Sequence, residues 1–130
     1  MFTQSVSSAA LEKAMSATWQ KAELITHNIA NEDTPGYKAK RLEFESLLGA
    51  AMESNMRATA FDKTSRISRI NNLQPVVYSD DSHEVRIDGN NVDIDSEQME
   101  LARTQIQYQA LRDRVSGHYS LLKYAISGGR

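Results

Sequence analysis

The chain has 130 residues, a net charge of −2 and no cysteine. This length suits one domain, and the missing cysteine excludes disulfides, thiolate nucleophiles and cysteine metal sites. A charge so close to zero argues against a nucleic-acid binder that depends on phosphate contacts. No apolar run approaches the ~18–20 residues of a membrane span, and the first residues lack the features of a cleaved secretory signal. We expect a cytoplasmic protein, or one exported without a cleaved signal.

The first predicted element is a long helix over about residues 5–31, a region without glycine or proline. Apolar residues recur there at alternating spacings of three and four, which is the seam of a coiled coil. Thr18 is its one polar member. The apolar members of this seam are Leu11, Met15, Ala22, Ile25 and Ile29.

A sharply specified turn follows this helix. Asn31 suits a helix end because its short side chain tolerates a left-handed backbone. Pro35 cannot lie inside a helix, and Pro35-Gly36 suits the two central positions of a type II turn, where glycine supplies the positive φ. This turn predicts that the chain leaves the helix at a fixed angle, as a segment that must dock in one orientation would require. The residues that define it are Asn28, Asn31, Thr34, Pro35, Gly36 and Tyr37.

The middle of the chain, residues 40–94, is less regular. Apolar residues from Leu42 to Met52 suggest a short helix, and Val76–Tyr78 suggests a short strand. Residues 85–87 and 92–94 alternate around Asp88-Gly89-Asn90-Asn91, which predicts a β-hairpin. Residues 53–75 are polar and only weakly periodic.

A second long helix is predicted over about residues 96–126. Asp95 is a good N-cap, and Gln98 completes a capping-box pattern with it. Gly128-Gly129 ends the helix. Its seam also alternates by three and four, with Thr104 and His118 as polar members. The apolar residues that we expect to carry assembly on this seam are Leu101, Tyr108, Leu111, Val115 and Leu122.

These elements predict a mainly α-helical fold with a small irregular or β-hairpin middle segment. We expect the two terminal helices to pair, either as a coiled-coil-like hairpin within one chain or across copies of the chain. Residues 1–39 and 95–130 would form a discontinuous helical assembly core, and residues 40–94 a separate middle segment. Because the seams are not purely Leu or Ile, we expect the ends to gain order on association.

No constellation in the sequence predicts catalysis or metal binding. His27, His83 and His118 lie far apart, and none has a second histidine at helical metal-site spacing. Asn91, Asp93 and Asp95 alternate like the start of a calcium loop, but Ser96 and Ala102 stand where glycine and glutamate are needed. We therefore expect no enzyme activity, no cofactor, no metal and no small-molecule substrate.

Two motifs resemble a known family. Residues 28–31 and 34–38 are similar to the N-terminal signature shared by bacterial flagellar rod and hook proteins. Residues 89–95, with Glu97, Leu101-Ala102 and Tyr108–Leu111, are similar to the proximal-rod members of this family. The length of the chain also fits those members, because the larger relatives carry long inserted domains. The resemblance covers both ends and is weakest over residues 53–80.

The resemblance implies a structural subunit that self-assembles helically into the drive shaft of the flagellar basal body. Its implied partners are other copies of itself, other rod subunits and the basal-body adaptor at the membrane ring. The flagellar type III export apparatus would carry it to the periplasmic rod without a cleaved signal peptide. The turn residues and the two seams would be the assembly residues.

One alternative class stays open on the sequence alone. A small helical adaptor or export chaperone would also carry two long amphipathic helices. Such a protein should be a stable, fully helical dimer by itself, whereas a rod subunit should be a weakly helical monomer that polymerises when concentrated.

Overall fold

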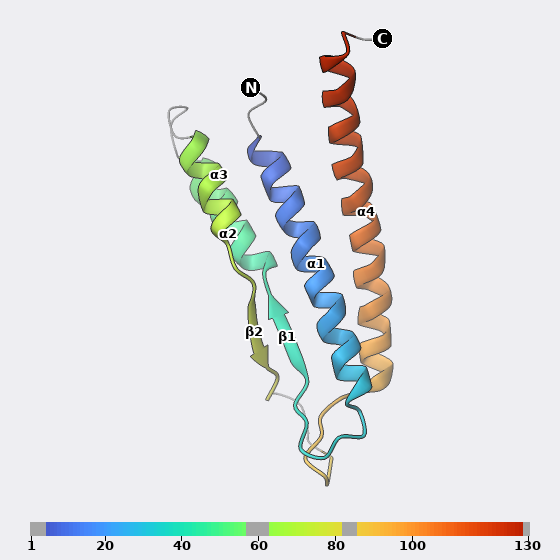
Figure 1. Cartoon of the computed structure of the whole chain (residues 1–130). Helices are drawn as coiled ribbons and strands as arrows, with labels where there is room; N and C mark the ends of the chain where they lie inside the picture. Colours follow the sequence, from blue (N-terminus) through green and yellow to red (C-terminus); the bar gives the residue numbers. More distant parts are fainter. Residues whose placement is uncertain (1–4, 57–62, 82–85, 129–130) are drawn as a thin grey trace.

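The computed structural model describes residues 5–56, 63–81 and 86–128, and it is mainly helical. Two long antiparallel helices lie side by side along the molecule, and a small middle segment lies against the first of them (Figure 1). The helices are α1 (Val6–Ala30) and α4 (Ile94–Ile126). The predicted fold class is confirmed, and the two helices pair within one chain. The predicted division into residues 1–39 with 95–130 and residues 40–94 stays a prediction.

Helix α1 begins and ends close to the predicted positions. Ser5 is the N-cap, and its hydroxyl accepts a hydrogen bond from the Ser8 amide while the Ser8 hydroxyl accepts one from the Ser5 amide. This reciprocal capping satisfies two donors at the start of the helix. The expectation of a left-handed Asn31 is wrong, because its φ is −106°. The Asn31 side chain instead donates to the His27 carbonyl at 2.7 Å, which satisfies the helix end without strain.

The middle segment contains two strands and two short helices. Strands β1 and β2 pair antiparallel, with Lys40 opposite Ser79 and Glu43 opposite Val76. Strand β1 and helix α3 both contact α1 (Figure 1). The elements in chain order are β1 (Lys40–Glu43), α2 (Glu45–Met56), α3 (Lys63–Asn72) and β2 (Val76–Ser79).

The sequence predicted part of this segment correctly. The strand at Val76–Tyr78 is confirmed. The short helix begins at Glu45 rather than Leu42, because residues 40–43 pair with β2 as a strand. Helix α3 was not predicted, because most of its residues are polar and its one buried residue, Ile70, gives no apolar periodicity.

The predicted β-hairpin around Gly89 is wrong. Val85 lies outside the described residues, and no strand is formed over residues 86–93. Arg86 and Asn90 close a turn instead: the Arg86 amide donates to the Asn90 carbonyl and the Gly89 amide to the Arg86 carbonyl. The backbone here is held by the turn and by the Asn90 side chain, which donates to the Asn31 and Thr34 carbonyls.

Helix α4 starts earlier than predicted. Its N-cap is Asp93, whose carboxylate accepts hydrogen bonds from the amides of Asp95 and Ser96. The predicted capping box of Asp95 with Gln98 is therefore wrong. Asp95 and Glu97 lie in the first turn, where their charges complement the helix dipole. At the other end, Ser127 is the C-cap and Gly128 has a φ of +68°, so the predicted stop is confirmed for Gly128; Gly129 lies outside the described residues.

The core is thin and half polar. Several of its buried apolar residues are alanines, which bury little area, and polar residues are buried among them. A core of this kind provides modest stability for a single chain. The buried apolar residues are Ala9, Ala17, Ile25, Ala39, Phe44, Ile70 and Val92, and the buried polar ones are Ser8, Thr18, Asn28, Asp80, Asn90, Glu97 and Thr104.

Candidate assembly site

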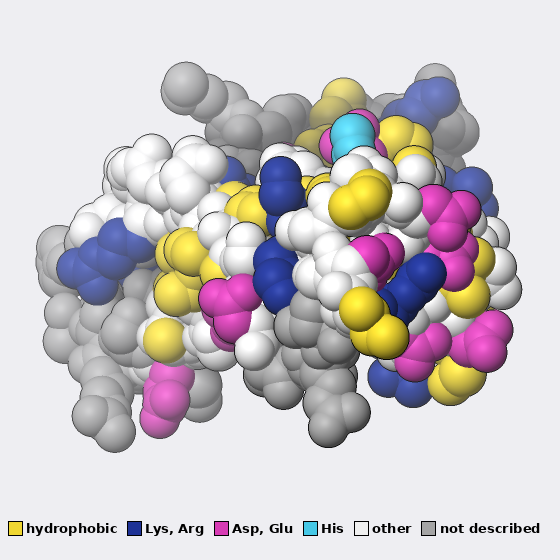
Figure 2. Space-filling view, turned by 90° about the horizontal axis from the view of Figure 1, so that it is seen from below, with side chains coloured by type: hydrophobic (Ala, Val, Ile, Leu, Met, Phe, Trp, Pro, Cys, Tyr) yellow, Lys and Arg dark blue, Asp and Glu magenta, His cyan; other side chains and the backbone are white. Residues whose placement is uncertain are grey.

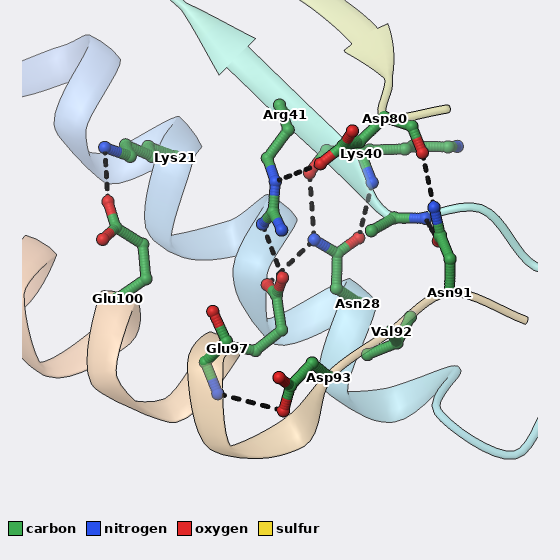
Figure 3. Close-up of polar contacts among 12 residues, drawn as sticks. Lys21, Asn28, Lys40, Arg41, Asp80, Asn91, Val92, Asp93, Glu97 and Glu100 are labelled. Atoms are coloured by element: carbon green, nitrogen blue, oxygen red, sulfur yellow. Dashed lines mark hydrogen bonds and ion pairs between the residues drawn. The ribbon is translucent and has the colours of Figure 1, made fainter. Parts of the chain in front are cut away.

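Asn28, near the end of α1, is the centre of a buried polar cluster that joins both long helices to β1 (Figure 3). Its amide nitrogen donates to the Lys40 carbonyl at 2.9 Å and to Glu97 Oε2 at 3.0 Å. Its amide oxygen accepts from the Lys40 amide at 2.9 Å and from the Tyr37 hydroxyl at 3.2 Å. An asparagine side chain offers two donors and two acceptor positions. All of them are used here.

Glu97 brings a negative charge into this cluster from the first turn of α4. Its side chain is only 1% exposed. The Arg41 guanidinium of β1 donates to Glu97 Oε1 and also approaches Asp80 Oδ2 at 3.4 Å, just beyond β2 (Figure 3). A buried carboxylate is tolerated when it is paired and hydrogen-bonded. Arg41 therefore links the middle segment to the start of α4.

The turn after α1 has the geometry expected from Pro35-Gly36. The Tyr37 amide donates to the Thr34 carbonyl at 3.2 Å, and Gly36 has a φ of +73°. These are the features of a type II turn with glycine at its third position. The Thr34 hydroxyl donates to Asn31 Oδ1 at 3.1 Å, which ties the turn back to the helix end.

Asn90 and Asn91 clamp this turn from the segment that precedes α4. Asn90 is fully buried, and its amide nitrogen donates at 2.8 Å to both the Asn31 and Thr34 carbonyls. The Asn91 side chain accepts from the Ala39 amide at 2.7 Å and donates to the Asp80 carbonyl. Hydrogen bonds from the side chains of the two asparagines thus satisfy backbone groups in this region, where the predicted β-hairpin is not formed.

Two glycines let the two loops meet. A Cβ atom added to Gly89 would lie 3.2 Å from the Gly36 Cα, and Gly89 has a φ of +86°. Here the Gly36 amide donates to the Asp88 carbonyl at 2.9 Å. Glycine is needed at Gly89 both for its backbone conformation and for this close approach.

Electrostatics in and near the cluster follow from the same contacts. Burial, and then the neighbouring charge of Glu97, raises the pKa of Tyr37. Burial alone would lower the pKa of Arg41, but its hydrogen bonds and ion pairs with Glu97 and Asp80 raise it overall. The Lys21 ammonium, 2.8 Å from Glu100, lowers the pKa of that carboxyl. Both pKa shifts therefore reinforce the ordinary protonation states at neutral pH, a neutral Tyr37 and a charged Arg41.

The hydrogen bonds of this cluster suit a structural role, in which its side chains hold the surrounding elements together. The four hydrogen-bonding positions of the Asn28 amide are committed to other groups of the chain. Among the described residues, no three histidine, aspartate or glutamate side chains gather in a way that could hold a metal ion. The end of the molecule that carries the loops shows acidic and basic side chains close together, with hydrophobic ones between them (Figure 2).

The six turn residues predicted from the sequence meet in this region. Asn28 is buried, Asn31 and Tyr37 are half-buried, and Thr34, Pro35 and Gly36 are exposed. Sequence reasoning missed Arg41, Asn90 and the structural role of Glu97. Asn90 and Glu97 both belong to the motif that resembles the family, but the hairpin interpretation assigned the asparagines to a turn, and Arg41 had no signal.

The predicted seam residues lie on the facing sides of α1 and α4. Ile25 is buried, and the others are half-buried. Trp19, beside this seam, contacts Tyr108 with ring centroids 5.7 Å apart. The half-buried seam residues are Leu11, Met15, Ala22, Ile29, Leu101, Tyr108, Leu111, Val115 and Leu122. Whether they also contact other subunits stays a prediction.

These contacts define a helical-hairpin module that buried amides hold together at one end. Residues 10–38 match the model of a family described as flagella basal body rod protein. The chain is 40% identical over 126 residues to the flagellar basal body rod protein FlgB of Bacillus subtilis (strain 168), covering 92% of each chain. It is 28% identical over 126 residues to FlgB of Escherichia coli (strain K12), covering 91% of each.

This chain belongs to the family of flagellar basal body rod proteins, and its role is that of a structural subunit of the flagellum. The resemblance in the two sequence motifs is thereby confirmed, and so is the basal-body location that it implied. No helix in the described part of the chain is long and apolar enough to cross a membrane.

Proposed function

We propose that this chain is a non-catalytic subunit that joins other rod components through the exposed sides of the α1–α4 hairpin. The single observation that carries the proposal is that α4 is apolar on two sides. One side faces α1, and large hydrophobic side chains on the other are exposed, including Ile106 at 69% and Leu121 at 71%. Exposed apolar surface of this kind marks interaction sites.

The polar cluster has a supporting role in this proposal. Asn28, Asn31, Thr34, Pro35, Gly36 and Tyr37 fix the angle at which the middle segment leaves the hairpin. The seam residues hold the two helices together so that the outer face of α4 is presented as a rigid surface. A rigid surface loses little conformational entropy when subunits associate.

The partners in this proposal are other copies of the chain, other rod subunits and the adaptor at the membrane ring. The flagellar type III export apparatus would deliver the chain to the periplasmic part of the rod. No nucleic acid, cofactor or small substrate is part of the proposal. Among the described groups with shifted pKa values, Tyr37, Arg41, Glu100 and Tyr119 are each bound to neighbouring side chains, which suits a structural role.

A complementation experiment tests this proposal. Cells of a normally motile strain whose own gene for this chain has been deleted would receive the full chain or the variants Ile106→Glu and Leu121→Glu. We expect loss of swimming and loss of the chain from purified basal bodies, because each variant places a charge in the outer face of α4. Gln107→Glu is the matched control, since it adds the same charge to an exposed position of the same helix. Normal basal bodies with both outer-face variants would contradict the proposal.

A further inference from the structure

We infer that the open edge of strand β2 pairs unassembled copies of this chain two by two, so that their small sheets join into one larger sheet. The occupant of the edge is β2 of a second copy, running antiparallel to the first. This contact is formed by the middle segment and not by the α1–α4 hairpin. It is therefore distinct from the contacts of the proposed rod subunit.

The register of the sheet decides which backbone groups of β2 point away from β1. Ala39 and Asp80 lie opposite one another just beyond the two strands, and the Asp80 amide donates to the Ala39 carbonyl at 2.8 Å. In an antiparallel pair, residues that bond the neighbouring strand alternate with residues that do not. Tyr78 therefore bonds β1, whereas the amides and carbonyls of Val77 and Ser79 point outward.

Strand β1 shows how outward groups of this kind are satisfied in the fold. Lys40 lies opposite Ser79, and its outward amide and carbonyl both bond the Asn28 side chain at 2.9 Å. Strand β2 lies on the side of β1 away from α1 (Figure 1). Within the part of the chain that the structure describes, no hydrogen bond satisfies the outward groups of Val77 and Ser79. An edge with unpaired donors and acceptors is a template for another strand.

The side chains of β2 add an apolar surface to this open edge. Val76, Val77 and Tyr78 are 52%, 51% and 48% exposed, so neither face of the strand is buried. Two strands alone are marginally stable in water, and a sheet gains stability from further strands and covered apolar side chains. A strand added to β2 would satisfy the backbone edge and cover part of these side chains together.

The positions of the outward groups fix the register of a two-fold pair. If Val77 of each copy lies opposite Ser79 of the other, every outward amide and carbonyl of the two β2 strands is bonded across the contact. Tyr78 then lies opposite Tyr78 of the second copy, with about 4.5 Å between their Cα atoms, as in a cross-strand pair without hydrogen bonds. Aromatic pairs in this position stabilise antiparallel strands.

The residues on either side of β2 favour this antiparallel pair over a parallel one. Asp81 is exposed just after the strand. Parallel strands would bring the Asp81 carboxylates of the two copies side by side, where they repel one another. Antiparallel strands place them at opposite ends of the contact. Pro75, just before the strand, has no amide to donate, so the contact stays close to the length of β2.

The small size of the contact predicts weak, reversible pairing. Strand β2 has only 4 residues, whereas a stable interface uses about 20–30 residues on each side, so we expect a dissociation constant of roughly 0.1–1 mM. A two-fold contact is complete with two copies. The pair would therefore cover the apolar edge in unassembled chains without starting a fibre.

Disulfide crosslinking of the purified full chain tests this register, because the chain has no cysteine of its own. Tyr78→Cys places two thiols opposite one another at a Cα separation that a disulfide can span. Val76→Cys is the matched control, since Val76 is on the same strand and similarly exposed. In the inferred register, its two copies lie more than about 13 Å apart. Both proteins would be oxidised mildly at the same concentration and separated without reductant.

We expect Tyr78→Cys to give dimers and no larger species, at least about tenfold faster than Val76→Cys, because only the first pair meets disulfide geometry. Adding Val77→Pro to Tyr78→Cys removes an outward amide and leaves the bonds to β1 in place. This change should lower the rate to that of the control, and circular dichroism would confirm that the variant is folded. Adding Ile106→Glu should leave the dimer unchanged, since Ile106 lies on α4.

Three outcomes would overturn the inference. Equal rates for Tyr78→Cys and Val76→Cys would show that the register is wrong. The absence of a Tyr78→Cys dimer at millimolar concentration would show that the edge does not pair. An unchanged rate with Val77→Pro would show that the edge hydrogen bonds are not used. These results concern the purified chain, whereas failure of the proposed function would appear in the basal bodies.

Discussion

Asn28 of α1 donates a buried hydrogen bond of 3.0 Å to Glu97 of α4, although 69 residues separate them in the sequence. This bond joins the end of one terminal helix to the start of the other. Around it, the same asparagine also bonds both backbone groups of Lys40. The relative position of the three elements therefore depends on one amide.

Replacing this amide should have a large effect for a single side chain. Asn28→Ala would leave the Glu97 carboxylate and the Lys40 backbone groups without their partners. We expect a loss of about 2–4 kcal/mol in the free energy of unfolding, measured by urea denaturation followed by circular dichroism. Gln20→Ala, on the exposed side of the same helix, should change it by less than about 0.5 kcal/mol. Equal losses in the two variants would contradict this account.

A charge at the same position gives a sharper test. Asn28→Asp would place a second carboxylate against Glu97, and like charges in one site cannot both be ionised easily. We expect this variant to regain stability relative to the native chain as the pH falls below about 5, since a protonated carboxyl can again donate. A pH-independent difference between the two chains would show that the bond to Glu97 matters little.

The Arg41–Glu97 ion pair should also be destabilised by removing one partner. Arg41→Met would leave a buried carboxylate with fewer donors, and we expect a loss of about 2–3 kcal/mol. Because Arg41 itself is partly exposed, the loss should lie below that of a fully buried pair. The double variant Arg41→Met with Glu97→Gln should lose less than the sum of the single variants, as unfolding in urea would show. Strict additivity would argue that the two side chains act independently.

Two glycine-to-alanine substitutions should change the stability in opposite directions, because Gly89 lies where two loops approach closely and Gly49 lies in a helix. Gly89→Ala should destabilise the chain by more than about 1 kcal/mol, because alanine disfavours the positive φ and its Cβ would crowd Gly36. Gly49→Ala is the contrasting change, since Gly49 lies in α2 with no atom of a described residue within 4 Å of an added Cβ. That variant should gain about 0.5–1 kcal/mol. Thermal unfolding of both proteins checks the opposite signs.

The buried Thr104 hydroxyl predicts a stabilising change. It has no hydrogen-bond partner among the residues that the structure describes, although its residue is 1% exposed. Thr104→Val keeps the shape and removes the unsatisfied group, so we expect a gain of about 1 kcal/mol. Thr18→Val is the matched control on α1, where the hydroxyl donates to the Ala14 carbonyl at 2.7 Å. A gain in the control as large as in Thr104→Val would refute the explanation.

The raised pKa of Tyr37 predicts sensitivity to alkaline pH. Burial and Glu97 disfavour its phenolate, so the folded state binds this proton more tightly than the unfolded state. Its contribution is fully present below the ordinary pKa of 10.0 and is lost as the pH rises through the higher folded value. Tyr37→Phe should lose about 1 kcal/mol at neutral pH, and this difference should shrink at high pH. A constant difference across the alkaline range would contradict the mechanism.

The two long helices and the turn after the first of them could be predicted from the sequence, and the middle segment only in part. The spacing of residues such as Ile25 and Leu111 predicted both helices and their facing sides, because helical periodicity is repeated over many turns. Pro35 and Gly36 predicted the turn, because their backbone preferences are local. The alternation around Gly89 predicted a hairpin wrongly, since side-chain bonds from Asn90 satisfy the backbone that a second strand would otherwise serve.

Only part of the polar cluster could be predicted from the sequence. The signature that includes Asn28 and Asn31 marked its position, but not its partners. Arg41 and Glu97 look like ordinary surface charges, and nothing local says that they meet in the interior. Such contacts depend on the angle between helices and the depth of a loop, which no spacing pattern records.

Helix α4 has 33 residues and α1 has 25, and the first turn of α1 and the last turn of α4 lie at the same end of the molecule (Figure 1). Tyr119 still reaches Glu12 of α1, and the last turn of α4 beyond it projects past the first turn of α1 (Figure 1). The two ends of the subunit therefore differ chemically. Buried amides join the elements at the loop end, whereas the last turn of α4 exposes hydrophobic side chains at the other. Copies stacked in one sense, as the proposed assembly requires, would all present this projecting turn on the same side.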